Sequence, residues 1–303
     1  MRLNGSKTAG HLACAGAYII FGLNIVFCKD IANSDVISPI ALFSLRALGA
    51  SALFWLVSAF LPQEKVERGD FPKIALASFL GLFLTQVSFL VGIRMVTSID
   101  CSIMGTLGPV ITMLFAAIFI KEPVTWKKTL GVCTSLAGVI FLILNSITAG
   151  NGAAQTRPLG IVMMLVNISS FSAYLGIFKP LISKYSAVTF MKWMFLFSLL
   201  MSLPFSLKGL LEVDYLHIPK NVALEIGFLI FFATFVAYFL IPFGQKRIRP
   251  TLVSMYNYIQ PILAVVVSIC IGMDKLSADK VIAIAFVVAG VLIVNRSRSA
   301  QTQ

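Results

Sequence analysis

The sequence predicts an all-α integral membrane protein with ten transmembrane helices, arranged as two five-helix repeats of inverted topology. Three observations support this prediction: an apolar composition, a repeat within the chain, and a series of long apolar segments. Of the 303 residues, 58% are hydrophobic and 12% are charged, and the mean hydropathy is +0.94. Soluble domains carry about 25% charged residues, so this chain has too little polar material to cover a soluble fold.

The chain contains an internal repeat, which is visible when the sequence is shifted along itself by about 152 positions. Residues 92–143 then align without a gap to a segment near the C-terminus. The matched pairs are Gly92 with Gly244, Ser102 with Ser254, Pro109 with Pro261, Lys128 with Lys280, and Ala137–Val139 with Ala289–Val291. Residues 21–29 match residues 171–179 at a slightly different offset. We therefore predict two repeats, 1–148 and 158–303, joined by a linker at 149–157 and forming one transport domain.

The transmembrane segments follow from length, since a helix needs about 20 mostly apolar residues to cross the hydrocarbon. Ser38–Pro39 and Arg157–Pro158 each place proline at a first helical turn, where its missing N–H is harmless. The basic N-terminus lacks a small-residue cleavage site, so we expect the first helix to be retained. The predicted spans are 10–28, 38–60, 73–93, 100–120, 127–145, 158–178, 187–207, 222–243, 251–271 and 279–295.

Topology follows from the number of helices in each repeat. Because five is odd, the second repeat must enter the membrane from the opposite side, as in transporters built from inverted repeats. Most loop Lys and Arg residues then fall on the side of both termini, and the positive-inside rule makes that side cytoplasmic. We expect a multi-pass protein of the cell (cytoplasmic or inner) membrane.

The composition also argues against several classes of function. The net charge of +12 comes from Lys and Arg in short loops between apolar spans, which favours membrane orientation over nucleic-acid binding. The five cysteines show no CxxC spacing and no histidine partner, so neither a metal site nor a cofactor is expected. No HExxH or GxSxG motif and no facing pair of carboxylates is present, which argues against an enzyme.

Polar residues inside the apolar spans are the candidates for a substrate pathway, because burying an unpaired amide or hydroxyl costs about 1–3 kcal/mol. Such side chains should face a cavity or a neighbouring helix, and hydrogen bonding between helices is the simpler alternative. The segment that leads into Pro261 is the richest in them. The candidates are Asn24, Gln86, Thr106, Asn167, Ser170, Tyr174, Tyr238, Tyr256, Asn257 and Gln260.

Prolines and buried cations are a second group of candidates. Pro109 and Pro261 occupy equivalent positions and should kink their helices near mid-membrane, as hinges or as static bends. Arg46 lies deep in the second span, where it contacts substrate or, as the simpler alternative, bonds to backbone carbonyls. Lys29 and Lys179 end equivalent helices, either to guide an anion or as interfacial anchors.

Acidic residues are expected only in loops or at the ends of spans, and Asp30, Asp100 and Glu225 come closest to the membrane interior. A proton-driven antiporter generally needs an embedded carboxylate or histidine whose pKa can change. This distribution disfavours proton-coupled export of cations and favours a neutral or zwitterionic substrate.

Several motifs resemble one family. Gly105–Pro109, Lys121–Pro123 and Leu136–Val139 resemble the repeat of the EamA-type transporters of the drug/metabolite transporter superfamily, and Ala41–Arg46 is similar to its second-helix pattern. The second copy is similar too, with Asp274 where the family usually has Glu. The resemblance implies that helices 1, 3, 4, 6, 8 and 9 enclose a central substrate cavity. It leaves the substrate open, because members transport amino acids, sugars, nucleotide conjugates and other metabolites.

These observations predict a secondary (non-ATP) metabolite transporter that works by alternating access. The favoured substrates are amino acids or similar small zwitterionic metabolites, moved by export or facilitated diffusion. The alternative is an uptake permease or exchanger for a sugar or a nucleotide-type, anionic metabolite. The expected partners are a small-molecule metabolite and the lipid bilayer, without an obligatory protein partner.

Overall fold

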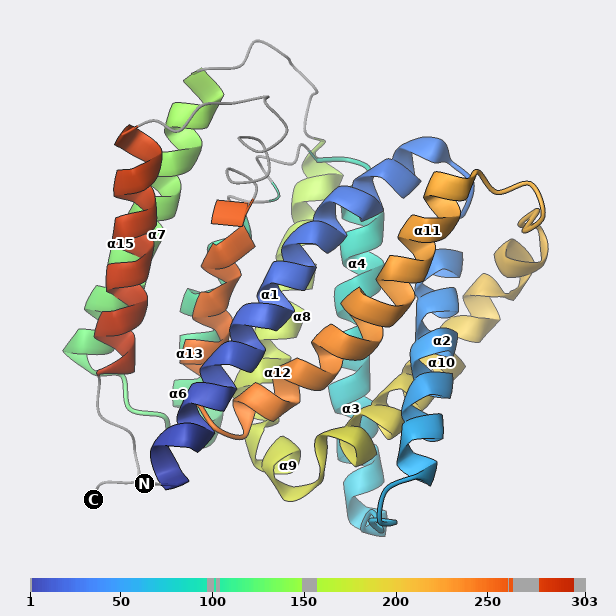
Figure 1. The fold of residues 1–303 in the computed structure, drawn as a ribbon, viewed down its shortest axis with the longest axis horizontal. Helices are drawn as coiled ribbons and strands as arrows, with labels where there is room; N and C mark the ends of the chain where they lie inside the picture. The colour runs from blue at the N-terminus through green and yellow to red at the C-terminus, as the bar shows by residue number, and fades with distance from the viewer. Residues whose placement is uncertain are drawn as a thin grey trace.

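The computed structural model describes residues 2–96, 101, 104–148, 157–260, 262–263 and 278–296. All regular secondary structure within these ranges is helical, and the long helices run side by side as a bundle (Figure 1). The first part of the chain contains α1 (Arg2–Ser34), α2 (Pro39–Ala59), η1 (Arg68–Asp70), α3 (Phe71–Ser78), η2 (Phe79–Leu84), α4 (Thr85–Gly92), α6 (Gly108–Ile120) and α7 (Trp126–Thr148). The second part contains α8 (Pro158–Ile177), α9 (Lys179–Lys184), α10 (Ala187–Leu211), α11 (Lys220–Phe228), η3 (Leu229–Val236), α12 (Ala237–Gln245), α13 (Pro250–Met255), η4 (Tyr256–Tyr258) and α15 (Ala278–Asn295).

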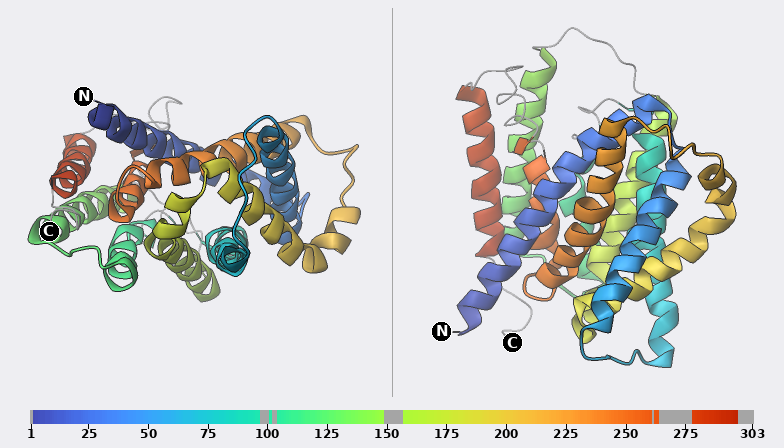
Figure 2. Two further views of the ribbon diagram at one scale, coloured as in Figure 1. Left: turned by 90° about the horizontal axis from the view of Figure 1, so that it is seen from below. Right: turned by 45° about the vertical axis from the view of Figure 1, so that its right-hand side comes forward.

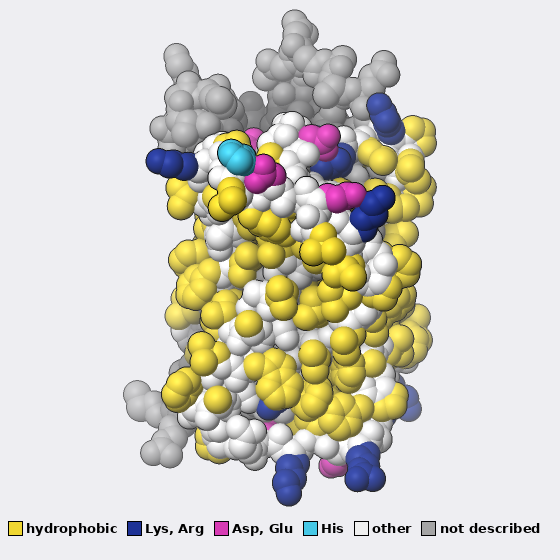
Figure 3. Space-filling view, turned by 90° about the vertical axis from the view of Figure 1, so that its right-hand side faces the viewer, with side chains coloured by type: hydrophobic (Ala, Val, Ile, Leu, Met, Phe, Trp, Pro, Cys, Tyr) yellow, Lys and Arg dark blue, Asp and Glu magenta, His cyan; other side chains and the backbone are white. Residues whose placement is uncertain are grey.

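Six helical segments in the described residues are long and apolar enough to cross a membrane. They are Lys7–Ser34, Pro39–Ala59, Arg68–Gly92, Pro158–Ile177, Ala187–Leu211 and Lys220–Gln245, and α6 is a shorter apolar helix. Figure 3 shows a broad band of hydrophobic side chains on one face, with charged side chains gathered at its two ends. The predicted first, second, third, sixth, seventh and eighth spans are therefore confirmed as helices of the required length and polarity.

The remaining predicted spans are only partly described. Helices α7 and α15 coincide with the predicted fifth and tenth spans, while parts of the spans predicted at 100–120 and 251–271 lie outside the described residues. The predicted linker at 149–157 is likewise described only at Arg157. In the views of Figures 1 and 2, α7 and α15 lie together at one edge of the bundle.

Helix starts follow the expected capping chemistry. The Ser38 hydroxyl accepts a hydrogen bond from the Ala41 amide, and the Ser186 hydroxyl accepts one from the Thr189 amide at 3.1 Å. Both are standard N-cap contacts, and each satisfies a backbone donor that the helix itself leaves unpaired. These serines fix where α2 and α10 begin.

Two of the long spans contain π-helical turns near their middle. Helix η2 interrupts the span Arg68–Gly92, and η3 interrupts Lys220–Gln245, at corresponding places in the two parts of the chain. In each case a threonine hydroxyl donates to the carbonyl five residues earlier: Thr85 to Leu80 and Thr234 to Leu229, both at 2.6 Å. Such turns occur often at functional sites, and both adjoin the cavity described below.

Polar contacts join the loops at one end of the bundle, which we call the α9 end. Lys179 donates to the Ile248 carbonyl at 2.7 Å, Lys184 pairs with Asp70 at 2.7 Å, and Arg249 donates to the Val294 carbonyl at 3.1 Å. The α9 end thus brings together the start of α3, helix α9, the loop before α13 and the end of α15. Figure 1 shows that α1 also begins at this end.

Candidate functional site

A cavity lies between helices from both parts of the chain. It contains about 790 Å³ of space between atoms, including the part open to solvent. Its walls come from α1, α4, α6, α8, α12, α13, η4 and the residues next to them. These elements belong to the first, third, fourth, sixth, eighth and ninth predicted spans, which are the spans that the resemblance implied.

Six of the ten predicted pathway residues line the cavity. They are Asn24, Gln86, Asn167, Tyr238, Asn257 and Gln260. Each is a polar side chain in an otherwise apolar span, so the cost of burying polar groups was a useful guide to the cavity wall.

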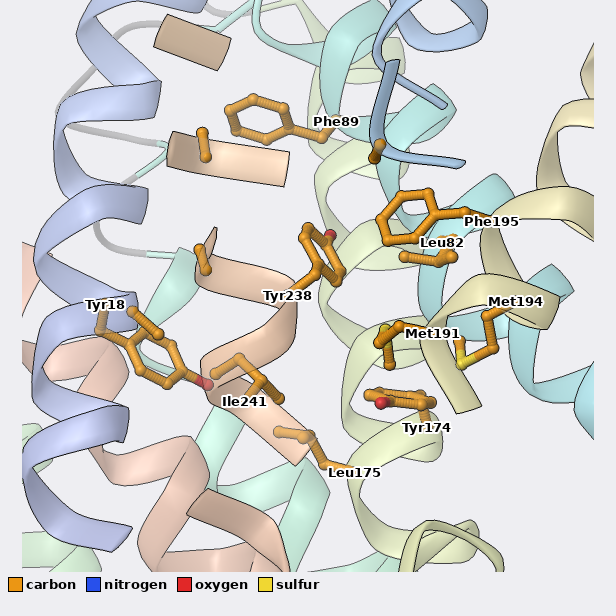
Figure 4. Packing of buried hydrophobic residues seen from close by; sticks show 14 of the residues in the cluster. Tyr18, Leu82, Phe89, Tyr174, Leu175, Met191, Met194, Phe195, Tyr238 and Ile241 are labelled. Atoms are coloured by element: carbon orange, nitrogen blue, oxygen red, sulfur yellow. The ribbon is translucent and has the colours of Figure 1, made fainter. Parts of the chain in front are cut away.

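The other four predicted residues lie elsewhere. Tyr174 packs beside Met191 and Met194 of α10 (Figure 4), and the Tyr256 hydroxyl bonds to Nδ1 of His11 at 2.7 Å. The Thr106 carbonyl accepts from the Tyr258 hydroxyl at 3.3 Å, and Ser170 is buried away from the cavity lining. These four residues lie outside the described cavity lining.

Several cavity residues were absent from the predicted set. Tyr18, Thr85, Thr112, Ser172 and Ser254 also line the cavity. Tyr18 could have been found, because Tyr18, Phe21 and Asn24 recur at helical spacing along one face of α1. The serines and threonines carry no such signal, since their hydroxyls can bond to the preceding turn of their own helix; Ser254, for example, donates to the Thr251 carbonyl at 2.9 Å.

The structure corrects the prediction of a proline kink within the fourth helix. Pro109 stands in the first turn of α6, which begins at Gly108, and the chain turns at residues 106–107 just before it. At a first turn the missing N–H of proline breaks no helical hydrogen bond, so Pro109 starts a helix after a break in the span. Pro261, the second predicted hinge, lies outside the described residues.

Three hydrogen bonds in or next to the cavity wall connect residues that are 152 positions apart. Gln86 Nε2 donates to the Tyr238 hydroxyl, Asn257 Nδ2 donates to the Gly105 carbonyl at 2.7 Å, and the Tyr258 hydroxyl donates to the Thr106 carbonyl. The same offset relates the matched segments of the sequence. Equivalent positions of the repeat therefore contact each other around the cavity.

The cavity is polar without being charged. None of the described residues in its lining is Asp, Glu, Lys, Arg or His. Asn167 and Asn257 use their Nδ2 groups to donate to the carbonyls of Thr85 (2.8 Å) and Gly105, which holds both amides in place. Aromatic side chains, including Phe21, Phe89 and Phe171, supply the apolar part of the wall. This surface suits a small molecule with both hydrogen-bonding and apolar groups.

Arg46 lies outside the cavity lining and is almost fully buried, with 1% of its surface exposed. Its Nε donates to the Thr234 hydroxyl at 2.8 Å, its Nη1 contacts the Cys28 sulfur at 3.8 Å, and its Nη2 has no hydrogen-bond partner. Backbone carbonyls were the expected partners; the structure shows a hydroxyl and a thiol in their place.

Lys29 and Lys179 both bond to backbone carbonyls. Lys29 donates to Ile93 and Val96, at 2.8 and 3.2 Å, and Lys179 donates to Ile248. Burial lowers the pKa of Lys179 to about 8, although the nearby charge of Glu122 acts in the opposite direction. Lys29 thus links α1 to the residues after α4, and Lys179 links the start of α9 to the loop before α13.

Carboxylates at the α9 end are more buried than their position in loops suggested. Glu122 lies in the loop after α6, yet its side chain is 5% exposed and its Oε1 is 2.7 Å from Nζ of the fully buried Lys128. The Thr251 hydroxyl donates to the same oxygen at 3.3 Å. Glu122 is turned inward because Lys121 adopts a left-handed conformation, with φ of 54°, that ends α6.

Asp70 forms a second buried cluster at the α9 end. Its carboxylate accepts from Lys73 at 2.9 Å and from both Lys184 and the Tyr185 hydroxyl at 2.7 Å. Both clusters cross between the two parts of the chain. Sequence reasoning missed them because distance along the chain does not reveal which loops meet.

Comparison with known proteins agrees with this geometry. The model of the EamA-like transporter family matches the chain twice, at residues 8–144 and 158–296. The chain is 24% identical to an uncharacterized transporter of Archaeoglobus fulgidus, over 86% of this chain and 90% of that protein. It is 23% identical to the uncharacterized transporter YetK of Bacillus subtilis, over 95% of this chain and 87% of that protein.

Two further similarities concern a named activity and the fold. A probable terminal-alkyne amino-acid exporter of Streptantibioticus cattleyicolor is 25% identical over 47% of this chain and 46% of its own length. A solved structure, titled only as the crystal structure of a protein, superposes with a TM-score of 0.67 at 18% identity, covering 92% of this chain and 95% of that one. It shares the fold. With matches to both halves of its length, this chain belongs to the EamA-like transporter family and is a multi-pass membrane transporter, not an enzyme.

Proposed function

We propose that this protein is a secondary exporter or facilitator of amino acids or similar small zwitterionic metabolites. The observation that carries the proposal is the uncharged, polar cavity between the two parts of the chain. Amide and hydroxyl groups can bind an ammonium and a carboxylate together, whereas a cavity for a cationic drug would need a buried negative charge. The name of the Streptantibioticus relative, an amino-acid exporter, favours the same substrate class.

The proposed architecture is ten helices in two inverted repeats, 1–148 and 158–303, with the linker 149–157 between them. The two family matches and the 152-residue contacts support it. So do the lysine contacts: Lys29 bonds to Val96 and Lys179 bonds to Ile248, and these pairs are related by offsets of 150 (179 − 29) and 152 (248 − 96). Inverted repeats of this kind support alternating access around a fixed central site.

The α9 end would then be the cytoplasmic side of the cell (cytoplasmic or inner) membrane, with both termini on that side, as the distribution of Lys and Arg favours. Asp70 with Lys184, and Glu122 with Thr251, connect the two repeats at this end. Both connections would have to separate before substrate could enter from the cytoplasm. The breaks near Pro109 and, by the repeat, near Pro261 are the proposed hinges for that movement.

The alternative is uptake or exchange of an anionic sugar or nucleotide-type metabolite. Among the described residues, Arg46 favours it, because its guanidinium forms no ion pair with a described carboxylate. Lys29 and Lys179 favour it less, since both donate to backbone carbonyls and neither is in the described cavity lining. We prefer the zwitterionic substrate because the described cavity lining contains no cation to bind a phosphate directly.

Counterflow in proteoliposomes tests the proposed substrate class. We expect preloaded amino acids with apolar side chains to drive uptake of the labelled compound, at a rate that an imposed pH gradient does not change. The reason is that the described cavity lining holds no carboxylate or histidine to carry a proton. Liposomes without protein give the background. Strict dependence on the gradient would contradict facilitated transport, and flux of sugar phosphates without amino-acid flux would favour the alternative.

Asn257→Ala is expected to reduce counterflow by about tenfold or more at low substrate concentration. The substitution removes a cavity amide and frees the Gly105 carbonyl; a hydrogen bond to a charged group contributes about 1.5–3 kcal/mol, and 1.4 kcal/mol corresponds to tenfold in affinity. Gln260→Ala should have the same direction of effect. Tyr256→Phe is the matched control, because the hydroxyl of Tyr256 bonds to His11 outside the cavity lining. Wild-type flux in both Asn257→Ala and Gln260→Ala would show that residues 257–260 do not belong to the substrate site.

A further inference from the structure

A buried guanidinium lies directly behind the cavity wall. Arg46 is 1% exposed, its Nη2 has no hydrogen-bond partner, and no described carboxylate forms an ion pair with it. A charged group in the membrane interior is costly, and such residues usually pair with another charge or mark a substrate path. No described carboxylate is therefore close enough to Arg46 to form an ion pair with it.

Short chains of contacts connect Arg46 to the cavity. Its Nη1 contacts Cys28, and the Cys28 thiol donates to Asn24 Oδ1 at 3.6 Å. Asn24 lines the cavity. On the other side, Arg46 Nε donates to Thr234, which lies one helical turn before Tyr238, another cavity residue.

These contacts leave hydrogen-bond donors free on one part of the cavity wall and acceptors free on another. Because Asn24 Oδ1 accepts from Cys28, the amide Nδ2 of Asn24 remains available as a donor. Tyr238 accepts from Gln86, so its own hydroxyl proton is also available. Asn167 and Asn257 behave in the opposite way: their amide nitrogens donate to backbone carbonyls and their Oδ1 atoms remain as acceptors. The wall from α1 and α12 thus offers donors, and the wall from α8 and η4 offers acceptors.

We propose that Arg46 is a positioning residue that directs the substrate's carboxylate to Asn24 and Tyr238, leaving its ammonium for Asn167 and Asn257. Arg46 acts through its electric field and through the side chains it holds, without touching the substrate. A fixed charge has a strong effect in a site of low dielectric constant, and the carboxylate brings a negative charge toward Arg46. This inference deepens the proposed function and rests on it.

Glu225 is the acid to consider as a competing counter-charge. It lies in α11, is half-buried, and is near enough to Cys28 to interact with it electrostatically. If Glu225 balanced Arg46, Glu225→Gln would change carboxylate binding as much as a substitution of Arg46 does. We expect it to leave carboxylate binding unchanged.

The test compares ligands that differ only in one charged group. Purified full-length protein is titrated with L-leucine, L-leucinamide (no carboxylate) and N-acetyl-L-leucine (no ammonium), by thermal shift and by inhibition of labelled leucine counterflow. Leucine is the probe because Phe21, Phe89 and Phe171 give the cavity an apolar part. We expect wild-type protein to prefer leucine over leucinamide by at least about tenfold.

Arg46→Met should reduce this preference to near unity, and Arg46→Lys should restore most of it. Asn167→Leu, in contrast, should weaken discrimination against N-acetyl-L-leucine and keep discrimination against leucinamide. Asn24→Asp, which is nearly isosteric and places a negative charge on the wall, should reverse the preference toward leucinamide. This variant also keeps the test decisive if Arg46→Met does not fold.

The outcomes separate the two proposals. The role of Arg46 is overturned if folded Arg46→Met protein keeps the wild-type preference for leucine over leucinamide. It is also overturned if Asn24→Asp protein keeps that preference. If wild-type protein neither binds nor transports amino acids, the proposed function fails, and the pair isocaproate and isocaproamide then tests Arg46 alone. Stabilisation by isocaproate that is lost in Arg46→Met would support the carboxylate site, and no stabilisation of wild type by any carboxylate would overturn it.

Discussion

Lys128→Met is expected to destabilise the protein by about 3–5 kcal/mol, the usual cost of breaking a buried ion pair from one side. Lys128 and Glu122 have side-chain exposures of 0% and 5% and approach to 2.7 Å. Removing the amine leaves the buried carboxylate without its ion-pair partner, with the charges of Lys179 and Arg249 nearby, and Glu122 Oε2 has no hydrogen-bond partner to compensate. The Pro123 carbonyl also loses its donor at 2.9 Å. Thermal unfolding of purified protein in detergent measures the effect.

Two controls make this result specific. Lys208→Ala breaks an exposed pair with Glu212, where the side chains are 89% and 65% exposed and 3.7 Å apart; exposed pairs contribute about 0–1 kcal/mol. The double variant Glu122→Gln, Lys128→Met should recover part of the loss, because it leaves no unpaired buried charge. If Lys128→Met protein melts at the same temperature as the wild type, the ion pair contributes nothing to stability.

Glu122 also shows what one sequence can and cannot predict. Its position after an apolar helix correctly predicted a loop, because the end of a span follows from local hydropathy. Its burial depends on Lys128, which is near in the chain, and on Thr251, which is 129 positions away. Only the three-dimensional arrangement brings Thr251 to that loop. The expectation that acidic residues would lie in loops or at the ends of spans holds for Glu122, but it did not reveal the burial of Glu122. Asp30 and Glu225 lie within α1 and α11.

The cavity also shows which features one sequence can predict and which depend on packing. Asn24, Gln86, Asn167 and Asn257 could be predicted, since an amide in an apolar span needs a partner or a cavity. Tyr174 could not be separated from Asn167, because the two residues are two turns apart on one face of α8. Only the packed structure shows that this face meets the cavity at Asn167 and the methionines of α10 at Tyr174. Local patterns predict that a helix has a polar face, and packing determines what that face meets.

The repeat carries information that local patterns lack. An offset of about 152 positions found in the sequence is also the separation of Gln86 from Tyr238 and of Gly105 from Asn257. In the proposed inverted-repeat architecture, residues related by the two-fold axis would meet where they lie near that axis. A duplicated chain therefore carries long-range information that a single unit of the same length would lack.

Gly131→Ala is expected to be the second strongly destabilising substitution, with a cost of about 1–3 kcal/mol or more from overpacking. A Cβ at Gly131 of α7 would lie 2.6 Å from the Gly290 carbonyl oxygen and 2.9 Å from the Val294 amide nitrogen of α15. Both atoms belong to the backbone, so the overlap can be relieved only if the two helices move apart. In membranes, small residues are what allow helices to approach this closely.

Gly227→Ala is the matched control for this substitution. Gly227 lies in α11, and nothing lies within 4 Å of a Cβ built there; replacing a helical glycine by alanine in open space stabilises by about 0.5–1 kcal/mol. Equal melting temperatures for Gly131→Ala and Gly227→Ala would contradict the close packing of α7 on α15. The described cavity lining contains no residue of either helix, so Gly131→Ala protein that remains folded should keep the wild-type KM for substrate. Asn257→Ala should do the reverse and lower transport more than stability, because Gly131 packs two helices together whereas Asn257 is proposed to bind the substrate.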